Sequence, residues 1–171
     1  MQIAHEICCN CANTVEVRDN RGTTALPDHK DQNFMQALLI VAHGSRRAES
    51  NDEIRTLANK VETLSADAYG FVGSAFLELA EPSIPDGIQQ CIERGATLVT
   101  VMPFFLSAGR HVVTDVPEMV REKQREHPNV QIRMAPYLGV SSLMPDLILQ
   151  SAASACHCTG GDCTYPACIR G

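Results

Sequence analysis

Three side chains in this sequence are of the kinds that carry out metal and proton chemistry. His43, Glu78 and His111 each stand at the end of an apolar run or a few residues beyond it. Neutral imidazole binds iron, cobalt and nickel and titrates near neutral pH, so a histidine can hold a metal ion or accept a proton. A carboxylate can accept a proton or orient a neighbouring histidine. If the fold brings these three residues together, they form a candidate site for a divalent metal ion.

Each of the three residues also has an ordinary structural interpretation. A histidine that follows a strand is more often a capping or loop residue than a metal ligand, and Glu78, flanked by two leucines, could simply face solvent. Their equivalent positions after three successive strands favour the functional interpretation, because ligands bind beyond the carboxyl ends of parallel strands. Three arginines nearby, Arg46, Arg47 and Arg110, are then candidates for binding anionic groups or are solvated surface charges.

Other familiar site motifs are missing from the sequence. Neither G-x-G-x-x-G nor G-x-x-x-x-G-K-[ST] follows a predicted strand, so dinucleotide and P-loop triphosphate binding are not predicted. Gly44-Ser45 lacks the G-x-S-x-G pattern of hydrolases, and adjacent loop residues such as His43 and Ser45 rarely face each other as base and nucleophile.

The elements that must position these residues follow from the apolar pattern. Short apolar runs indicate buried strands, and apolar residues at helical spacing indicate amphipathic helices. The predicted strands are Ala37–Ala42, Phe71–Leu79, Thr97–Met102 and Val130–Met134, the last of which alternates like a half-exposed edge strand. The predicted helices begin at Ser50, Ser83, Val112 and Ser142, and the last one ends at Ala153.

Start and stop signals support these boundaries. Ser50 with Glu53 matches a capping box at the start of the first helix, and Ser83 followed by Asp86 opens the second, which Gly95 ends. The resulting β-α-β-α-β-α-β-α order predicts a three-layer α/β fold. Its four-stranded parallel sheet would have right-handed crossovers and helices on both faces.

The bulk composition excludes several classes of protein. With 171 residues, 44% of them hydrophobic, and a formal net charge of −6, the chain suits one domain. No apolar run approaches the roughly 20 residues that span a bilayer, and the N-terminal residues include no apolar stretch of signal-peptide length. An acidic chain is a poor general binder of nucleic acid or anionic membranes. We therefore expect a cytoplasmic protein with neither of these partners.

The eight cysteines lie mostly at the two ends of the chain, and only Cys91 lies in the middle. Without an export signal, we expect reduced thiols. Four of them close the chain: Cys156, Cys158, Cys163 and Cys168. Their spacing matches neither ferredoxin patterns nor paired C-x2-C zinc sites. A bound iron–sulfur cluster or metal, an unligated tail, and oxidised pairs all stay open.

Three segments are expected along the chain. Residues 1–34 are polar and lack periodicity, which indicates a flexible extension, residues 36–153 form the predicted domain, and residues 154–171 form a Cys-rich tail. Met35-Gln36 repeats the opening dipeptide directly before the first strand, so Met35 is an alternative natural start.

Three segments of the sequence carry the site candidates in a fixed order. They are Leu39–Arg46 (LIVAHGSR), Phe76–Pro85 (FLELAEPSIP) and Val101–His111 (VMPFFLSAGRH). In sequence and separation these segments resemble the short sirohydrochlorin chelatases of the CbiX type, relatives of SirB in the class II chelatase superfamily, over about Gln36–Ala153. The resemblance implies a flavodoxin-like chelatase domain that inserts a divalent metal into a sirohydrochlorin-type tetrapyrrole, in siroheme or cobalamin biosynthesis, without ATP.

The resemblance also implies roles for individual residues. His43 and His111 would hold the metal, and Glu78 would lie at the substrate as a third catalytic residue. The implied substrate-binding residues are Arg46, Glu78, Leu106, Ser107, Ala108, Gly109 and Arg110. Longer members contain two such domains, so a homodimer is the expected form of this chain. Some sirohydrochlorin chelatases carry a C-terminal iron–sulfur cluster, which favours that interpretation of the terminal cysteines.

The metal and the class of function still leave alternatives. Two histidines and a carboxylate do not separate Co²⁺ from Fe²⁺ or Ni²⁺, because selection depends on geometry and metal supply as much as on affinity. We place cobalt first and iron a close second. The competing function is a non-catalytic metal carrier that binds metal through the terminal cysteines. A weaker alternative is a protein that binds a phosphate ligand at Gly44-Ser45.

Overall fold

The computed structural model of this chain describes residues 35–65, 68–110 and 114–155. All of the described residues belong to the second of the two units into which the chain divides, Phe34–Gly171. Among them, no helix combines the length and apolar character that crossing a membrane requires.

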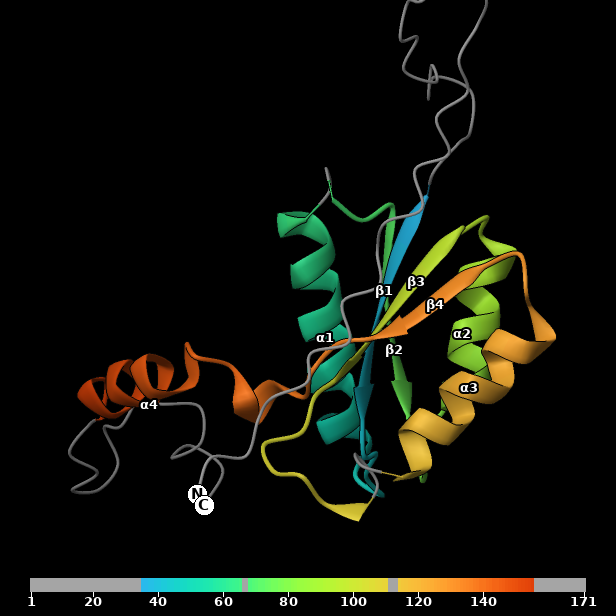
Figure 1. The fold of residues 1–171 in the computed structure, drawn as a ribbon. Helices are drawn as coiled ribbons and strands as arrows, with labels where there is room; N and C mark the ends of the chain where they lie inside the picture. Colours follow the sequence, from blue (N-terminus) through green and yellow to red (C-terminus); the bar gives the residue numbers. More distant parts are fainter. Residues whose placement is uncertain (1–34, 66–67, 111–113, 156–171) are drawn as a thin grey trace, which may run out of the picture. The chain divides into compact units, whose positions relative to one another are not determined.

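Four strands form a single parallel sheet, and the described residues confirm the predicted α/β architecture (Figure 1). The strands are β1 (Gln36–Ala42), β2 (Phe71–Phe76), β3 (Leu98–Pro103) and β4 (Gln131–Met134), in the spatial order β2-β1-β3-β4. Strand β1 lies in the middle and pairs with both β2 and β3, so Ala37 lies opposite Phe71 on one side and Val99 on the other.

Helices cover both faces of the sheet (Figure 1). Helix α1 (Ala48–Leu64) covers one face, and α2 (Ile84–Glu93) and α3 (Val116–Glu126) cover the other. A short 3-10 helix, η2 (Leu138–Val140), and α4 (Met144–Ala153) follow β4. Successive residues of β1 face opposite layers. Leu39 packs in the core with α2 and α3, whereas Ile40 packs with Ala58 of α1. This two-sided burial explains why the sequence of β1 is apolar throughout instead of alternating.

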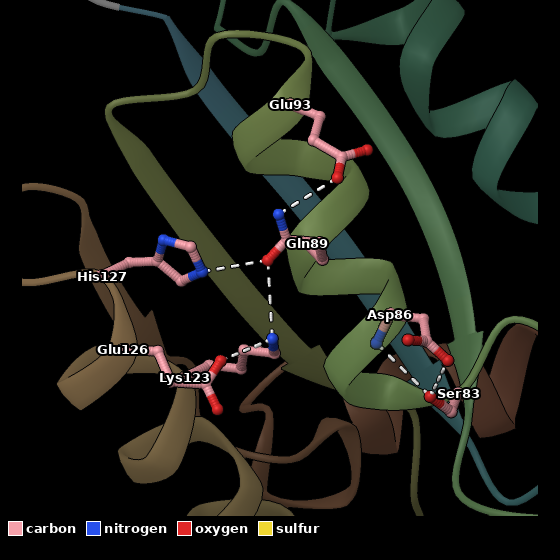
Figure 2. Close-up of polar contacts among 7 residues, drawn as sticks. All are labelled: Ser83, Asp86, Gln89, Glu93, Lys123, Glu126 and His127. Atoms are coloured by element: carbon pink, nitrogen blue, oxygen red, sulfur yellow. Dashed lines mark hydrogen bonds and ion pairs between the residues drawn. The ribbon is translucent and has the colours of Figure 1, made fainter.

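Side-chain contacts fix the start of α2 and tie it to α3, as Figure 2 shows. Ser83 is the N-cap of α2, and its hydroxyl accepts a hydrogen bond from the Asp86 backbone N–H at 3.3 Å, as the sequence predicts. The Gln89 side-chain oxygen lies 2.9 Å from His127 Nε2 and 3.5 Å from Lys123 Nζ, which joins the middle of α2 to the end of α3.

Two predicted boundaries near the site are wrong, and α3 and α4 begin at Val116 and Met144 instead of Val112 and Ser142. Helix α1 begins at Ala48 with Arg47 as its N-cap, so Ser50 lies inside the helix and forms no capping box with Glu53. Strand β2 ends at Phe76 instead of Leu79, because the chain bends away after Phe76 and Leu79 adopts a left-handed φ of 64°. Glu78 therefore lies in the loop that follows β2, at the carboxyl edge of the sheet.

The last elements are much less buried than the first. In β4 only Ile132 is buried, which agrees with a half-exposed edge strand. Helix α4 buries none of its residues. Several large apolar side chains on and just before it are exposed: Val140, Leu143, Leu147, Ile148 and Leu149.

Candidate metal and substrate site

The candidate residues lie where strand order reverses in the sheet. The chain leaves β1 toward β2 on one side, and the later strands β3 and β4 lie on the other side. Ligands of open parallel sheets bind in the crevice outside the carboxyl ends of strands at such a switch point. His43 directly follows β1, and the segment Phe104–Arg110 follows β3. The topology therefore places these two segments beside each other at the expected edge.

Main-chain hydrogen bonds hold the loops after β1 and β2 together beyond the ends of the strands. The backbone N–H of Leu77 donates to the Ala42 carbonyl at 2.9 Å, and that of Glu78 donates to the His43 carbonyl at 3.0 Å. The two loops therefore keep a parallel pairing for two residues after β2 has ended, and this pairing sets His43 opposite Glu78.

Gly44 allows this close approach of the two loops. Its φ of 92° lies in the region that disfavours L side chains. A Cβ atom at this position would lie only 1.8 Å from the Glu78 carbonyl oxygen. Both the backbone conformation and the available space therefore require glycine between His43 and the first turn of α1.

His43 and Glu78 form the central contact of the site. His43 Nε2 lies 3.5 Å from Glu78 Oε1, and the two side chains are 46% and 54% exposed. The pair therefore combines a nitrogen that can bind a metal with an oxygen that can bind it or accept a proton, and an incoming ligand can reach both. The structure brings together these two of the three predicted catalytic residues.

Helix α1 supports both loops through two side chains. The Arg55 guanidinium donates to the Glu81 carbonyl at 2.7 Å and to Asp52 at 2.8 Å, and it lies 5.1 Å from the centre of the Phe76 ring. The buried Asn51 contacts the backbone of Ser45. Sequence reasoning did not select either residue. An Asn inside a helical pattern gives no local signal of a role, and only the tertiary contact reveals it.

The predicted substrate-binding residues lie on exposed surface. Arg46 is exposed after β1, and Leu106, Ser107, Ala108, Gly109 and Arg110 form an exposed stretch after β3. The start of this stretch is fixed, because the Phe104 N–H donates to the Val41 carbonyl at 2.7 Å. The Gly139 N–H also donates to the Phe105 carbonyl at 2.9 Å. Leu106 itself is 72% exposed.

His43 and Glu78 do not make a complete metal cage on their own. Within residues 35–65, 68–110 and 114–155, no group of three His, Cys, Asp or Glu side chains is placed to hold a metal ion.

Several predicted residues lie outside the described residues. These are His111 and the four terminal cysteines, Cys156, Cys158, Cys163 and Cys168. Cys91 is described, is fully buried in α2, and packs in the core. Burial raises the pKa of its thiol to about 12, so Cys91 stays protonated and is not available as a thiolate ligand.

Comparisons with known proteins show the family to which this chain belongs. The family model CbiX matches residues 37–155. The chloroplastic sirohydrochlorin ferrochelatase of Arabidopsis thaliana is 37% identical over 111 residues, which are 65% of this chain and 48% of that protein. The sirohydrochlorin cobaltochelatase of Methanocaldococcus jannaschii is 36% identical over 86 residues, which are 50% of this chain and 59% of that protein.

A solved structure is similar as well. The sirohydrochlorin chelatase SirB from Bacillus subtilis subspecies spizizenii, in complex with cobalt, aligns with a TM-score of 0.63 and 26% identity. The alignment covers 70% of this chain and 50% of SirB. The chain spans about half the length of the first curated relatives that it matches. The matched family segment contains the whole sheet, both loops of the site and the His43–Glu78 pair, and the chain belongs to the CbiX family.

Proposed function

We propose that this chain is a sirohydrochlorin chelatase, which inserts a divalent metal into the tetrapyrrole without ATP. The observation that supports this function most directly is the His43–Glu78 contact of 3.5 Å at the switch point of the sheet. Relatives named as sirohydrochlorin ferrochelatases and cobaltochelatases make the same substrate class the first choice for this chain.

The reaction needs two functions that this pair can supply. The tetrapyrrole gives up two pyrrole N–H protons, and its nitrogens replace the ligands of the incoming metal. In our proposal His43 and His111 hold the ion, Glu78 accepts one of the two protons or orients His43, and the remaining protons pass to water at this exposed site. The nitrogens of the macrocycle fill the open coordination positions and draw the ion away. Arg46 and Arg110 are placed on exposed surface where they could bind carboxylates of the substrate.

Metal preference is part of the same proposal. We place Co²⁺ first and Fe²⁺ a close second, with Ni²⁺ as an alternative. Nitrogen and oxygen donors accept all three metals and do not separate them. One solved relative contains cobalt, and another contains Fe³⁺. The terminal cysteines begin at Cys156, directly beyond the matched family segment, so family membership adds no support for an iron–sulfur cluster there. A cluster therefore stays a prediction, as do the segment boundaries at residues 34–36 and 153–154 and the cytoplasmic compartment.

We further propose that two copies of the chain form the active unit. Helix α4 and the residues before it expose five large apolar side chains, and isolated proteins rarely leave large apolar patches in water. The chain also spans about half the length of the first curated relatives that it matches, so a second copy would supply a domain of comparable size.

The function is tested by mixing the full chain anaerobically with sirohydrochlorin and each of Co²⁺, Fe²⁺ and Ni²⁺. A chelatase accelerates the change in the tetrapyrrole absorption spectrum catalytically, over many turnovers. A metal carrier binds the ion through its cysteines and leaves the spectrum changing at the uncatalysed rate. Replacing all four terminal cysteines with Ser separates these outcomes further. It abolishes metal binding by a carrier and leaves the insertion rate of a chelatase whose site lies at His43 unchanged.

A further inference from the structure

Asn51 is an unusual residue for the interior of this fold. Within the described ranges, the buried polar or charged side chains are Asn51, at 6% exposed, and Thr100, at 7%. A buried amide costs free energy unless its donor and acceptor are both satisfied. Asn51 meets that condition, since no buried side-chain nitrogen or oxygen in the described residues lacks a partner.

Both polar groups of Asn51 bind the backbone of one residue. Its Oδ1 accepts a hydrogen bond from the Ser45 N–H at 2.9 Å, and its Nδ2 donates to the Ser45 carbonyl at 2.8 Å. The amide therefore occupies the two main-chain groups of Ser45 as a neighbouring strand would. The Ser45 hydroxyl is bound separately, by the backbone N–H of Arg47 at 3.1 Å.

These two hydrogen bonds, called the Asn51–Ser45 clamp below, hold a residue that is close to His43 in the sequence. Ser45 is two residues beyond His43, and Gly44 between them is in direct contact with the Glu78 carbonyl. The backbone carbonyl of His43 in turn accepts a hydrogen bond from the Glu78 backbone N–H at 3.0 Å. Asn51 therefore fixes one end of a three-residue segment whose other end carries the imidazole and pairs with the loop of Glu78.

Helix α1 is a rigid base for this clamp. Asn51 lies in the first turn of the helix, and Ala58, two turns later, is buried against Ile40 of β1 and Val72 of β2. The side chain thus connects the packed core to the loop that carries the imidazole.

We propose that Asn51 is a positioning residue of this site: its bidentate contact with Ser45 holds His43 at the distance from Glu78 that metal insertion requires. This role rests on the proposed function for its catalytic consequence. Asn51 is buried and acts through the loop, so it is not a catalytic residue. Outer partners that orient metal ligands are typically worth about 10–100-fold in affinity or activity.

The first test measures amide hydrogen exchange and does not depend on activity. In Asn51→Leu, which keeps the branched shape of the side chain and removes both hydrogen bonds, we expect the Glu78 amide to exchange at least about tenfold faster. Asn51 does not touch that amide, so the change reports the release of the His43–Gly44–Ser45 segment. The amides of Leu39 and Ile40 inside β1 should keep their wild-type exchange rates.

Three further variants provide the controls. Asn51→Ala repeats the test if the leucine variant fails to fold. Asn59→Ala removes an exposed Asn from the same helix and should leave every readout unchanged. Thr100→Val removes the other buried polar group, whose hydroxyl accepts a hydrogen bond from Arg133 at 2.9 Å, and should lower stability without accelerating exchange at Glu78 selectively.

The second test measures Co²⁺ insertion into sirohydrochlorin by these variants. We expect kcat to fall about 10–100-fold in Asn51→Leu and Asn51→Ala, with KM for the tetrapyrrole changing less than about threefold, and wild-type values in Asn59→Ala. The positioning role would be overturned if the amides of β1 exchange faster by the same factor as the Glu78 amide. It would also be overturned if the wild type is active and the Asn51 variants keep its kcat. If the wild type inserts no metal, the proposed function fails, and selective exchange at Glu78 still decides whether Asn51 holds the loops together.

Discussion

The two sides of the candidate site are built in different ways. On the β1 and β2 side, two backbone hydrogen bonds beyond the strand ends, the close contact of Gly44 with Glu78, and side chains from α1 hold the loops. On the β3 and β4 side, residues 106–110 are exposed and α4 buries nothing. Metal ligands need fixed geometry, whereas a large substrate or a second subunit needs accessible surface. In the proposed function, the first side supplies the fixed His43–Glu78 pair, and the second side supplies accessible surface for the substrate and a second subunit.

On the β1 and β2 side, adding a single methyl group at Gly44 should lower both stability and activity. In Gly44→Ala, we expect the free energy of unfolding to fall by about 3 kcal/mol, from the positive φ and the clash with the Glu78 carbonyl together. The rate of metal insertion should fall about 100-fold, because small displacements of reacting groups are costly. Urea unfolding and insertion kinetics measure the two effects.

Gly95→Ala is the matched control for this variant. Gly95 also has a positive φ, of 94°, but a Cβ there would meet no atom within 4 Å. Only the conformational cost of about 1–2 kcal/mol applies, and insertion should be unaffected. Equal losses of activity in the two variants would contradict the special role of the Gly44 contact.

On the β3 and β4 side, a charge placed on α4 should weaken the proposed dimer. In Leu147→Asp, on α4, we expect the dimer Kd to rise about 30-fold, because an interface leucine is lost and a carboxylate is buried. Sedimentation velocity over a range of concentrations measures this change. Leu64→Asp places the same charge at an exposed leucine of α1 and should leave assembly unchanged. A wild-type chain that stays monomeric at high concentration would show that α4 is not a dimer surface.

The smallest effect is expected at the edge of the sheet. Arg133 Nε donates to Thr100 at 2.9 Å, which joins β4 to β3 away from the His43–Glu78 pair. In Arg133→Ala, we expect thermal unfolding to show a loss of about 0.5–1.5 kcal/mol, with the insertion rate changed less than about twofold. A large loss of insertion in Arg133→Ala would mean that the Arg133–Thr100 contact, away from the His43–Glu78 pair, takes part in the chemistry.

Much of the architecture can be predicted from the sequence because local signals and burial agree. The wholly apolar β1 predicts a strand covered on both faces, and Leu39 and Ile40 do pack on opposite layers. Ser83 and Gly95 mark the ends of α2 through local hydrogen bonding and backbone preference. These features depend on residues close in sequence, so the pattern alone indicates them.

The features of the site that sequence reasoning missed depend on contacts between distant segments. Leu77-Glu78-Leu79 alternates like a strand, and the Glu78 N–H still pairs with the His43 carbonyl, yet β2 ends at Phe76 and the chain turns at Leu79, whose φ is 64°. Ser50 and Glu53 match a capping box, but α1 begins earlier, where Asn51 can reach Ser45. No local pattern reveals that an Asn in a helix holds a loop six residues before it.

The most direct test of the central claim compares two histidine variants in one insertion assay. His43→Ala removes the imidazole beside Glu78. His127→Ala removes an imidazole that is hydrogen-bonded to Gln89 at the junction of α2 and α3. With anaerobic sirohydrochlorin and Co²⁺, we expect His43→Ala to reduce the insertion rate at least about 100-fold and His127→Ala to retain it within about twofold. Equal rates for His43→Ala and the wild type would contradict the assignment of this site.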